Sequence, residues 1–540
     1  MPYQGFRTSW VVREIQIKAL ITTWYYVMNI NNYIEIKELT KEVIQQYLMN
    51  QYPWGIITRP LTPVAMAILS ITYAITVAML ILSLIQISVF VRYGITSLRY
   101  LKTHGRIDNS RIIDSTHGLP FVSVLIPIKN EDILTVKRSI RNMAVLNYPR
   151  NLFEVLFISD DPEYYVNSLV REIIPLADKL GINVRVIRRE VNKGYKGGAL
   201  NYGIKYAKGS VIAVFDVDTV VPSDYLIKAV NALLSGYDTV TGVWKGYYIS
   251  NTVVSKLLKF IYDVYNEVFF RGRFLSGSFP ALTGNNIVIW RNVLESIGGF
   301  CECTGEDLDI TIRLRAKGYR VGLIDSDVYV EVPQTYLALK KQYSRWLFSS
   351  IWNFKHNLRL LLSSKNMTAW EKVDGILWML QLPSLSFAAL SILITVILSV
   401  IGILVPPMPI LLLETLNAIT VLSLAMVLWS ISRRVGYSTR DFLINTARSA
   451  LLAMIMSFPM LIYSVESLIT DEWEWIPTPK GYSTHRYPFL RGLVHELSIT
   501  LMLAAVMVIL ILNDQLIFMF YIADILAILL YGFSLVIPRR

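Results

Sequence analysis

The sequence has few charged residues and almost no cysteine. Asp, Glu, Lys and Arg make up 17% of the 540 residues, whereas hydrophobic residues make up 54%. This shortage of charge excludes an ordinary soluble globular protein and predicts a membrane protein. The two cysteines, Cys301 and Cys303, are too close in sequence for a usual disulfide framework. We therefore expect a reducing compartment around them.

The sequence also lacks a long run of basic residues, although its formal net charge is +12 and its isoelectric point is about 9.3. A nucleic-acid-binding arm is therefore not expected. The positive excess fits cytoplasmic loops that face anionic lipid, or a cleft for a phosphorylated ligand. A cleaved signal peptide is not expected either, because Arg13, Glu14 and Lys18 interrupt every apolar run near the start.

Long apolar runs predict where the chain crosses a membrane. Residues 61–92 contain the first such run. By the positive-inside tendency, the basic residues that follow it place the next part of the chain in the cytoplasm. These residues are Arg92, Arg99, Lys102, Arg106 and Arg111. Residues 1–60 mix apolar and charged positions, and we expect amphipathic helices on the membrane surface there.

The C-terminal part, residues 374–540, is predicted to contain four more spans. They are residues 376–405, 410–431, 499–512 and 516–536. A further apolar stretch, residues 442–470, is interrupted by Arg448, Pro459 and Glu466. We interpret it as an interfacial or re-entrant helix. Five spans with an external N-terminus keep the basic loops and the basic C-terminus on the cytoplasmic side.

Between these parts, residues 93–335 alternate short β-branched runs with amphipathic helical stretches. That alternation predicts an α/β fold with a mainly parallel, doubly wound sheet, whose ligands bind at the carboxyl ends of the strands. Five strands are predicted from the runs FVSVLIPI, LFEVLFIS, NVRVIRR, VIAVFDV and TVTGVW. Polar residues follow three of them, and we expect these residues to meet at one edge of the sheet. They are Pro127, Asn130 and Glu131 after the first, Asp160 and Asp161 after the second, and Asp216 and Asp218 after the fourth.

The stretch Asn192–Asp218 joins a glycine-rich turn with two lysines to a helical segment and an apolar strand. Lys196 and exposed backbone N–H groups suit a diphosphate, and the carboxylates of Asp216 and Asp218 suit the divalent metal that neutralises it. By itself the pattern also fits an ordinary turn and a glycine-capped helix. Several polar clusters at one edge of one sheet favour a nucleotide site.

The downstream part carries candidates for an acceptor site. Residues 253–270 have the pattern of an amphipathic helix that rests on the membrane or covers the sheet. The turn Thr283–Asn286 is a candidate lining of an acceptor pocket. Glu306 and Asp307 precede a helix, where acidic residues also serve as plain N-caps. Residues 336–373, rich in Lys, Arg and Trp, are predicted to be interfacial helices.

Taken in order, these motifs resemble the membrane-integrated family 2 glycosyltransferases. The shared motifs are Ile126-Pro127 with Asn130-Glu131, Asp160-Asp161, Lys196 to Asn201, Asp216-x-Asp218, Glu306-Asp307 and Gln342-x-x-Arg345-Trp346. The resemblance covers about residues 120–350 and continues into the membrane part. Gln-x-x-Arg-Trp is typical of the processive branch, which includes cellulose and hyaluronan synthases. The resemblance implies an inverting enzyme with a GT-A fold in the cytoplasm, attached to a helical transmembrane region.

The resemblance also implies roles for individual residues. Asp307 would be the general base that takes the proton from the acceptor hydroxyl, and Arg345 would stabilise the leaving diphosphate. The donor would be bound by Pro127, Asn130, Glu131, Asp160, Lys196, Asp216 and Gln342. Asp218, with Asp216, would hold Mg²⁺ or Mn²⁺. Trp346, Asn285 and Glu306 would contact the acceptor, although a tryptophan beside a membrane also fits an interfacial belt.

Residues 471–490 resemble the gating loop of cellulose synthases through Trp475, Thr478 and Lys480. Trp475 stands where the family usually has Phe, and Pro477 where it has Val. A proline-stiffened surface loop therefore remains an alternative interpretation.

Our first hypothesis is a processive synthase in the plasma membrane, which polymerises sugar from a nucleotide-diphosphate donor, by resemblance a UDP-sugar, and exports the polysaccharide through its own spans. The alternative is an enzyme that adds one sugar to a lipid or polyprenyl phosphate. A third hypothesis, a transporter or receptor that senses nucleotide sugar, leaves Asp307 without a role. Pocket shape selects the hexose, so the sequence leaves the sugar, the linkage and the oligomeric state open.

Overall fold

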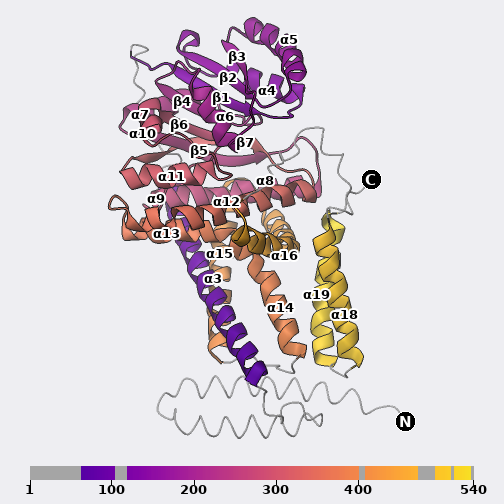
Figure 1. Cartoon of the computed structure of the whole chain (residues 1–540). Helices are drawn as coiled ribbons and strands as arrows, with labels where there is room; N and C mark the ends of the chain where they lie inside the picture. The colour runs from indigo at the N-terminus through magenta and orange to yellow at the C-terminus, as the bar shows by residue number, and fades with distance from the viewer. Residues whose placement is uncertain (1–62, 104–117, 401–407, 472–492, 513–515, 537–540) are drawn as a thin grey trace, which may run out of the picture. The chain divides into compact units, whose positions relative to one another are not determined.

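A computed structural model describes residues 63–103, 118–400, 408–471, 493–512 and 516–536 (Figure 1). The predicted N-terminal segment, residues 1–60, lies outside these residues, as do the predicted gating residues Trp475, Thr478 and Lys480. The chain divides into two compact units, residues 1–71 with 398–405 and residues 72–397 with 406–540. The sheet, the candidate site and all contacts described below belong to the second unit.

A seven-stranded sheet forms the centre of the α/β part, with the strand order β3-β2-β1-β4-β6-β5-β7. The strands are β1 Val122–Ile128, β2 Phe153–Ser159, β3 Val184–Arg188, β4 Val211–Phe215, β5 Thr239–Tyr247, β6 Asn286–Trp290 and β7 Val321–Glu331. β6 runs antiparallel to β4 and β5, and the other neighbours pair in parallel. The predicted mainly parallel sheet is confirmed. Two of its strands, β6 and β7, were not recognised in the sequence.

Helices cover both faces of the sheet because successive residues of its buried strands point to opposite faces. On β4, Val211, Ala213 and Phe215 pack in one apolar cluster, whereas Ile212 and Val214 pack in another. The first cluster includes α4 Ile133–Ala144, α5 Glu163–Leu180 and α7 Tyr225–Leu234. The second includes α6 Tyr195–Ile204, α10 Arg291–Ser296 and α11 Glu306–Lys317.

Further helices connect this layer to the membrane part. They are α8 Val253–Asn266, the π-helix η3 Glu267–Gly272, α9 Arg273–Leu275, α12 Tyr336–Ser363 and α13 Ala369–Gln381. The predicted amphipathic helix over residues 253–270 therefore changes to π geometry at Glu267. Glu267 lies between Lys245 of β5 and Arg271, and the Arg271 guanidinium lies 2.5 Å from a carboxylate oxygen of Asp325 on β7. These buried ion pairs attach η3 to the edge of the sheet.

Within the described residues, three helices are long and apolar enough to cross a membrane: Ser70–Lys102 of α3 (Pro63–Thr103), Leu412–Arg434 of α15 (Met408–Arg434), and α16 (Thr439–Ile469). The predicted span 376–405 is divided between α13 and α14 (Phe387–Val400), which meet at an angle of 46° and would count as a fourth. In α16, 44% of the apolar window is buried against protein, compared with 11% in α3 and α15. The length and composition of α16 fit a span, whereas the sequence predicted an interfacial or re-entrant helix.

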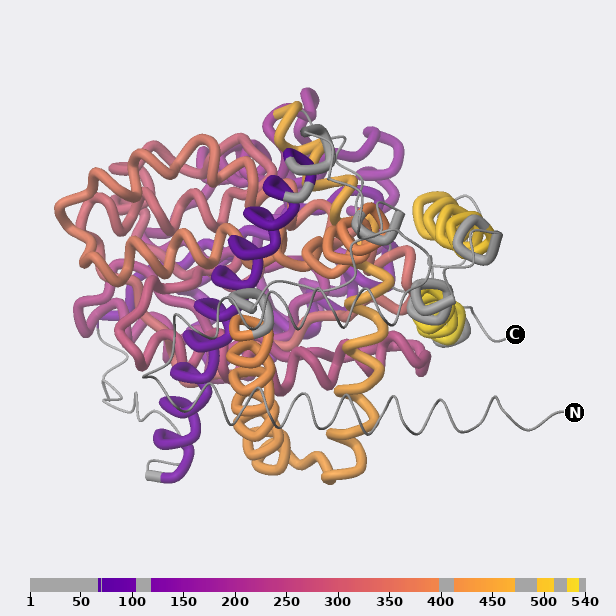
Figure 2. Tube along the Cα trace, turned by 90° about the horizontal axis from the view of Figure 1, so that it is seen from below, coloured from indigo at the N-terminus to yellow at the C-terminus, as the bar shows by residue number. Residues whose placement is uncertain are grey.

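The apolar helices pack in two groups. α3 and α15 lie side by side (Figure 2), and the Asn417 side chain donates a 3.0 Å hydrogen bond to the carbonyl of Leu80. α18 (Val494–Leu512) and α19 (Leu516–Val536) form a hairpin whose buried residues share a cluster with α12 and α16. Glu496 at the start of α18 accepts hydrogen bonds from Tyr336 and Lys340 of α12, at 2.6 and 2.8 Å. The C-terminal hairpin is thereby tied to the helix that carries Gln342 and Arg345.

Candidate active site

A cavity of about 800 Å³ opens at the carboxyl ends of β1, β2 and β4 and extends toward α8, η3, α12 and α13. Because parallel strands end at the same edge of a sheet, residues that are far apart in sequence line this one cavity. The predicted residues in its lining are Pro127, Glu131, Asp160, Lys196, Asp216, Asp218, Asn285, Glu306, Asp307, Gln342, Arg345 and Trp346. The cavity therefore contains the predicted donor, metal, base and acceptor residues together.

Asn130 is the one predicted site residue in the described part of the chain that does not line the cavity. Its backbone has a φ of 56°, and its N–H donates a 2.7 Å hydrogen bond to the Asp161 carboxylate. The Asp161 carboxylate also accepts from the Ser159 hydroxyl at 2.9 Å. Asn130 and Asp161 thus shape the turn between β1 and the cavity.

Lys196 lies at the centre of the charged half of the cavity. Glycines allow this position, because Gly194 precedes α6 with a φ of +77° and the backbone N–H of Gly198 bonds back to its carbonyl at 2.6 Å. The Lys196 ammonium lies 2.6 Å from Asp216, 2.6 Å from the Gly284 carbonyl and 3.6 Å from Glu306. Burial alone would lower the pKa of Lys196, but the carboxylates of Asp216 and Glu306 raise it. Lys196 is therefore a fixed cation, as a diphosphate site requires.

The carboxylates of Asp216 and Asp218 both face this half of the cavity. Asp218 is 1% exposed, and its carboxylate accepts a 3.2 Å hydrogen bond from the Glu331 N–H. Among the described residues, no group of three or more His, Cys, Asp or Glu side chains forms a metal cluster. Two carboxylates fit Mg²⁺ or Mn²⁺ only if other oxygens complete the coordination, and a donor diphosphate supplies such oxygens.

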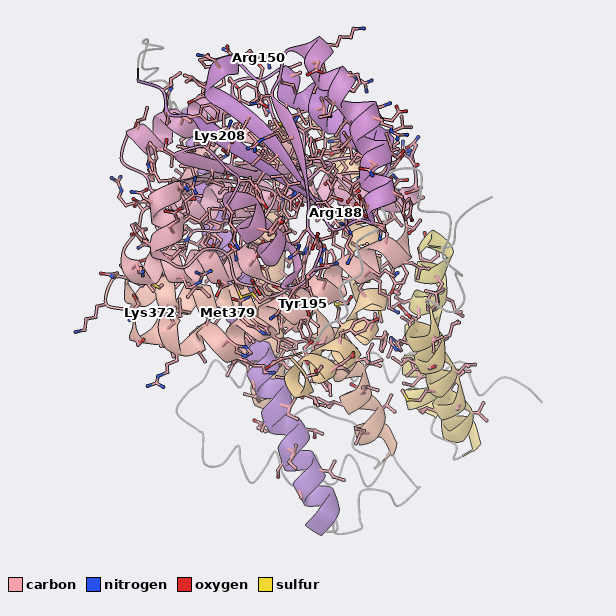
Figure 3. The ribbon with its side chains drawn as sticks, turned by 45° about the horizontal axis from the view of Figure 1, so that its top comes forward. Arg150, Arg188, Tyr195, Lys208, Lys372 and Met379 are labelled. Atoms are coloured by element: carbon pink, nitrogen blue, oxygen red, sulfur yellow. A yellow bond between two sulfur atoms is a disulfide. The ribbon has the colours of Figure 1, made fainter. Side chains whose placement is uncertain are left out.

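Arg189, which was not recognised in the sequence, holds residues 192–195 in place. We call these residues the donor turn, because the sequence predicted that they bind the donor. Arg189 is 6% exposed and donates hydrogen bonds of 2.6 Å to both carboxylate oxygens of Asp160. The same guanidinium donates to the carbonyls of Lys193 and Tyr195 and to the Asn192 side chain. Figure 3 shows Tyr195 between the sheet and the helices beneath it. The available signal was a basic residue directly after β3, at the strand edge where the other polar residues gather.

Glu306 and Asp307 occupy the first turn of α11, whose N-cap is Gly305. Neither residue is the N-cap, so the alternative interpretation of these acidic residues as plain N-caps is wrong. The Asp307 carboxylate accepts hydrogen bonds from the N–H groups of Gly284 at 3.2 Å and Leu308 at 2.8 Å. Burial raises the pKa of Glu306 to about 7 against the opposing effect of Lys196. Two carboxyl groups in different environments thus lie beside the donor cation.

Aromatic side chains line the other half of the cavity. They are Trp244, Tyr262, Tyr265, Phe269, Phe270, Tyr343, Trp346 and Trp378. Trp346 lies 5.6 Å from Trp244 and 5.3 Å from Tyr343 between ring centroids. Gln342, one turn earlier on α12, accepts a 3.3 Å hydrogen bond from the Tyr262 hydroxyl. Trp346 therefore contributes to the cavity wall, whatever its relation to the membrane surface.

Four buried polar atoms in this lining have no hydrogen-bond partner among the residues that the structure describes. They are Trp244 Nε1, the Tyr265 hydroxyl, Asn285 Nδ2 and Thr304 Oγ1. A buried polar atom without a partner costs free energy, so atoms of this kind at a cavity wall indicate a ligand that supplies the missing bonds. Rings with interspersed donors fit a polyhydroxylated ligand.

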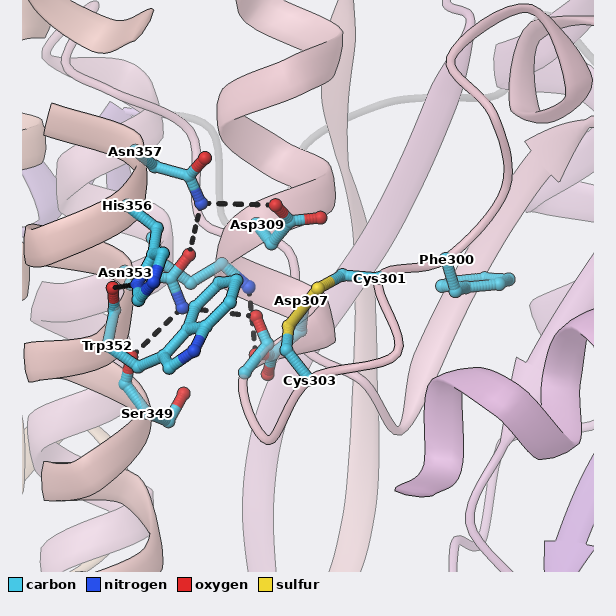
Figure 4. Close-up of a disulfide and its surroundings, with 12 residues drawn as sticks. Phe300, Cys301, Cys303, Asp307, Asp309, Ser349, Trp352, Asn353, His356 and Asn357 are labelled. Carbon is cyan, nitrogen blue, oxygen red and sulfur yellow. Dashed lines mark hydrogen bonds between the residues drawn. A yellow bond between two sulfur atoms is a disulfide. The ribbon is translucent and has the colours of Figure 1, made fainter. Parts of the chain in front are cut away.

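The structure corrects the prediction for the two cysteines. Cys301 and Cys303 are joined in a disulfide, with Cα atoms 5.2 Å apart, and Figure 4 shows it beside Asp307. The chain bends at Glu302, which brings the two cysteines within the usual Cα separation of a disulfide despite their proximity in sequence. A Cβ at Gly197 would lie 1.8 Å from the Cys301 carbonyl oxygen. The 301–303 turn therefore packs directly on the start of α6.

Two family models match parts of this chain. Residues 123–298 match the model "Glycosyl transferase family 2", and residues 211–464 match "Glycosyl transferase family group 2". A "Probable glycosyltransferase" of Sulfolobus acidocaldarius is 27% identical over 381 residues, which cover 67% of this chain and 78% of that protein.

Two other relatives have more specific names. A "Beta-monoglucosyldiacylglycerol synthase" of Trichormus variabilis is 31% identical over 277 residues, and a "Glucomannan 4-beta-mannosyltransferase 1" of Oryza sativa subsp. japonica is 28% identical over 271 residues. The alignments cover 49% and 48% of this chain and 57% and 51% of those proteins, so the chain spans about half the length of each. Among solved structures, the mannosyltransferase PcManGT from Pyrobaculum calidifontis, in complex with GDP-Man and Mn²⁺, aligns with a TM-score of 0.47 and 18% identity, over 73% of this chain and 99% of that one.

Proposed function

We propose that the chain is an inverting, metal-dependent and processive polysaccharide synthase, because residues 123–298 match the family 2 glycosyltransferase model. The donor is a nucleotide-diphosphate sugar, by resemblance a UDP-sugar. The observation that carries the proposal is the two-part cavity, in which a charged half built on Lys196 adjoins an aromatic half built on Trp346.

The charged half suits the donor. Asp160 and Glu131 line the part nearest β1 and β2, where a nucleoside fits, and Lys196 supplies a positive charge to the diphosphate. Asp216 and Asp218 would hold Mg²⁺ or Mn²⁺, which neutralises the diphosphate when bound. Arg345 approaches from α12, and its planar guanidinium suits phosphate oxygens as the diphosphate leaves.

We assign to Asp307 the removal of the acceptor proton. The N–H groups of Gly284 and Leu308 fix its carboxylate beside the donor cation. Asp307 takes the hydroxyl proton while the acceptor oxygen bonds to the anomeric carbon from the face opposite the diphosphate. The bond from that carbon to the diphosphate oxygen breaks, and the nucleoside diphosphate leaves with the bonding electrons. One displacement on the opposite face inverts the anomeric configuration.

The aromatic half favours a glycan acceptor. Sugar rings stack on aromatic faces, and sugar hydroxyls satisfy buried donors such as Trp244 Nε1 and Asn285 Nδ2. An acyl chain would leave those atoms without partners. A growing glycan that leaves this half meets Gln381, Leu382 and Leu385, where the cavity reaches the apolar helices. We also propose that the polysaccharide is translocated through the spans. In this proposal the protein lies in the plasma membrane with its catalytic domain in the cytoplasm.

The alternative is a single transfer to a lipid acceptor. The observation that favours it is the same end of the cavity, since Leu382 and Leu385 suit a lipid tail as well as a sliding glycan. The two functions share the donor half and the base. They differ in the number of sugars added to each acceptor, which product sizing measures directly.

The test is a donor screen on the purified full-length protein in detergent, with release of nucleoside diphosphate as the readout. We expect release with one or a few donors, loss of release with a metal chelator and recovery with Mg²⁺ or Mn²⁺. Asp307→Asn should lower kcat about 10²-fold to 10⁴-fold with little change in donor KM. Unchanged activity in Asp307→Asn would refute the assigned base.

Product sizing on the active donor then separates the two acceptor classes. A ladder of oligosaccharides supports the synthase, whereas one sugar per lipid molecule supports the alternative. Failure of every nucleotide sugar to release nucleoside diphosphate, with donor-dependent solute uptake in vesicles, would favour the transporter hypothesis and refute both.

A further inference from the structure

A buried cation packs against the aromatic rings of the cavity but does not itself line the cavity. Arg273, the first residue of α9, is 2% exposed. Its guanidinium carbon lies 4.9 Å from the ring centroid of Phe269 and 4.9 Å from that of Trp378. Both rings line the cavity, and they lie 5.9 Å apart. A cation over aromatic faces is attractive, and more so away from water, so Arg273 holds the two rings in one arrangement.

Asp374 fixes Arg273 in turn. The Arg273 Nε donates to the Asp374 carboxylate at 2.9 Å, and its terminal nitrogen donates to the Asp374 carbonyl at 3.1 Å. The same carboxylate accepts the Phe279 N–H at 3.0 Å and the Tyr93 hydroxyl of α3. Trp378 lies four residues after Asp374 on α13 and therefore on the same helix face. One buried carboxylate thus links α3, α9 and the helix that carries a cavity ring.

The C-terminal part of α3 contacts the same wall. The Phe90 ring lies 5.2 Å from Tyr265 and 6.3 Å from Phe269 between centroids. A Cβ at Gly272, at the end of η3, would lie 2.2 Å from the Tyr93 carbonyl oxygen, so the two backbones are in contact. A π-helical turn inside an α-helix is rare and is common at functional sites. Here it turns Phe269 and Phe270 toward the cavity.

We propose that Arg273 is a positioning residue for the acceptor: through Phe269 and Trp378 it sets the shape of the aromatic half of the cavity, and Asp374 couples that shape to Tyr93 of the first candidate span. The inference rests on the proposed function, because it takes this half as the acceptor site. Arg273 acts on the acceptor wall alone, since the donor residues Lys196 and Asp216 have separate contacts.

The discriminating variant is Arg273→Lys. It keeps a positive charge for Asp374, and so avoids leaving a buried carboxylate without a cation, but it loses the planar stack and the second hydrogen bond. Tyr93→Phe removes only the hydroxyl that bonds to Asp374. Arg185→Lys is the control: Arg185 pairs with the buried Glu154 at 2.7 Å, and neither residue lines the cavity.

The experiment measures KM for donor and for acceptor, and nucleoside diphosphate release without acceptor, on the full-length protein in detergent. The acceptor is the oligosaccharide pool isolated from the wild-type reaction. We expect Arg273→Lys to raise acceptor KM about 3-fold to 10-fold and Tyr93→Phe to raise it less. Donor KM and release without acceptor should stay within about 2-fold, and Arg185→Lys should leave acceptor KM unchanged.

Two results would overturn the inference: an unchanged acceptor KM in Arg273→Lys, or equal changes in donor and acceptor KM. If Arg273→Lys does not fold, Tyr93→Phe decides by the same criterion. If the wild-type protein transfers sugar to no acceptor, the proposed function is refuted. If the wild-type protein transfers sugar and the variants have the same acceptor KM, only the inference about Arg273 is refuted.

Discussion

Arg189 shows how one side chain can organise a ligand turn without lining the cavity. Its guanidinium joins Asp160 at the end of β2 to the carbonyls of Lys193 and Tyr195. A guanidinium presents several donors in a fixed plane, so no other side chain makes these contacts at once. The position of the donor turn therefore depends on Arg189.

We expect Arg189→Lys to raise donor KM about 10-fold or more while acceptor KM changes little. The reason is that an ammonium group cannot make the two coplanar hydrogen bonds with which the guanidinium holds Asp160. Steady-state kinetics with varied donor and with varied acceptor measure the two constants separately. A change in donor KM alone would match the position of Arg189, because its hydrogen bonds go to residues on the donor side of the cavity.

Arg185→Lys is the matched control on the same strand. Arg185 pairs with Glu154 at 2.7 Å and with the Tyr206 carbonyl, away from the donor turn. Its replacement should leave donor KM within about 2-fold. A similar rise of donor KM in both variants would show that β3 matters only for stability.

Glu306 gives the folded protein a pH dependence with a defined sign. Burial raises its pKa from the usual 4.5 to about 7, so the folded state binds the proton more tightly than the unfolded state. The stabilisation is complete below about pH 4.5 and is lost as pH rises through 7. A shift of this size corresponds to at most about 3 kcal/mol.

Thermal unfolding of the full-length protein in detergent and chelator, from pH 5 to pH 8, tests this dependence. Wild type should lose more stability over that range than Glu306→Gln, which has no proton to release. Parallel curves for the two proteins would contradict the assignment of the titration to Glu306. The comparison cancels the titration of all other groups.

The elements also show what the sequence reveals and what it hides. β1 to β5 are continuous β-branched runs, and their polar ends were enough to predict most of the cavity lining. β7 was missed because Asp325, Ser326 and Asp327 interrupt its apolar pattern. The charge of Asp325 is matched by Arg271, 54 residues away in sequence, and no local pattern reveals such a partner. Arg273 was missed for the same reason, because its partner Asp374 is 101 residues away in sequence.

The contact between α6 and the 301–303 turn gives a prediction about an element. We expect Gly197→Ala to weaken donor binding at least 10-fold or to prevent folding, because the added Cβ would lie 1.8 Å from a backbone oxygen that cannot move alone. Equilibrium binding of the donor and thermal unfolding measure the two effects.

Gly375→Ala on α13 is the control for the same substitution. Its Cβ would lie 3.2 Å from methyl carbons of Leu361, which can shift, and alanine favours the helix. We expect near-normal donor binding in this variant. Normal binding in Gly197→Ala as well would mean that α6 and the 301–303 turn separate without cost.

The whole molecule joins a soluble domain to candidate spans, and one contact indicates their orientation. The Tyr437 hydroxyl, in the loop between α15 and α16, donates a 2.7 Å hydrogen bond to Asp263 of α8. Arg433 and Arg434, the last two residues of α15, directly precede this loop. They belong to the basic loops that were predicted to face the cytoplasm. This basic segment therefore lies on the same side as the α/β domain.

Single-cysteine reporters test this arrangement in a chain with Cys301→Ser and Cys303→Ser. A membrane-impermeant maleimide should label Arg434→Cys and Lys208→Cys from the same side of sealed vesicles, since Lys208 is exposed on the α/β domain. Labelling of the two from opposite sides would contradict the orientation. Both positions are exposed, so the access of the reagent decides the result.

The bond between Tyr93 and Asp374 also has a consequence for biosynthesis. The two residues are 281 positions apart, with all seven strands of the sheet between them. At about 5–20 residues per second, a ribosome needs roughly 15–60 s to make the second after the first. During that interval α3 is already available to the membrane, whereas its buried carboxylate partner does not exist. The final seating of α3 against η3 and α9 is therefore a late, post-insertion step of assembly, which a chain truncated before Asp374 cannot complete.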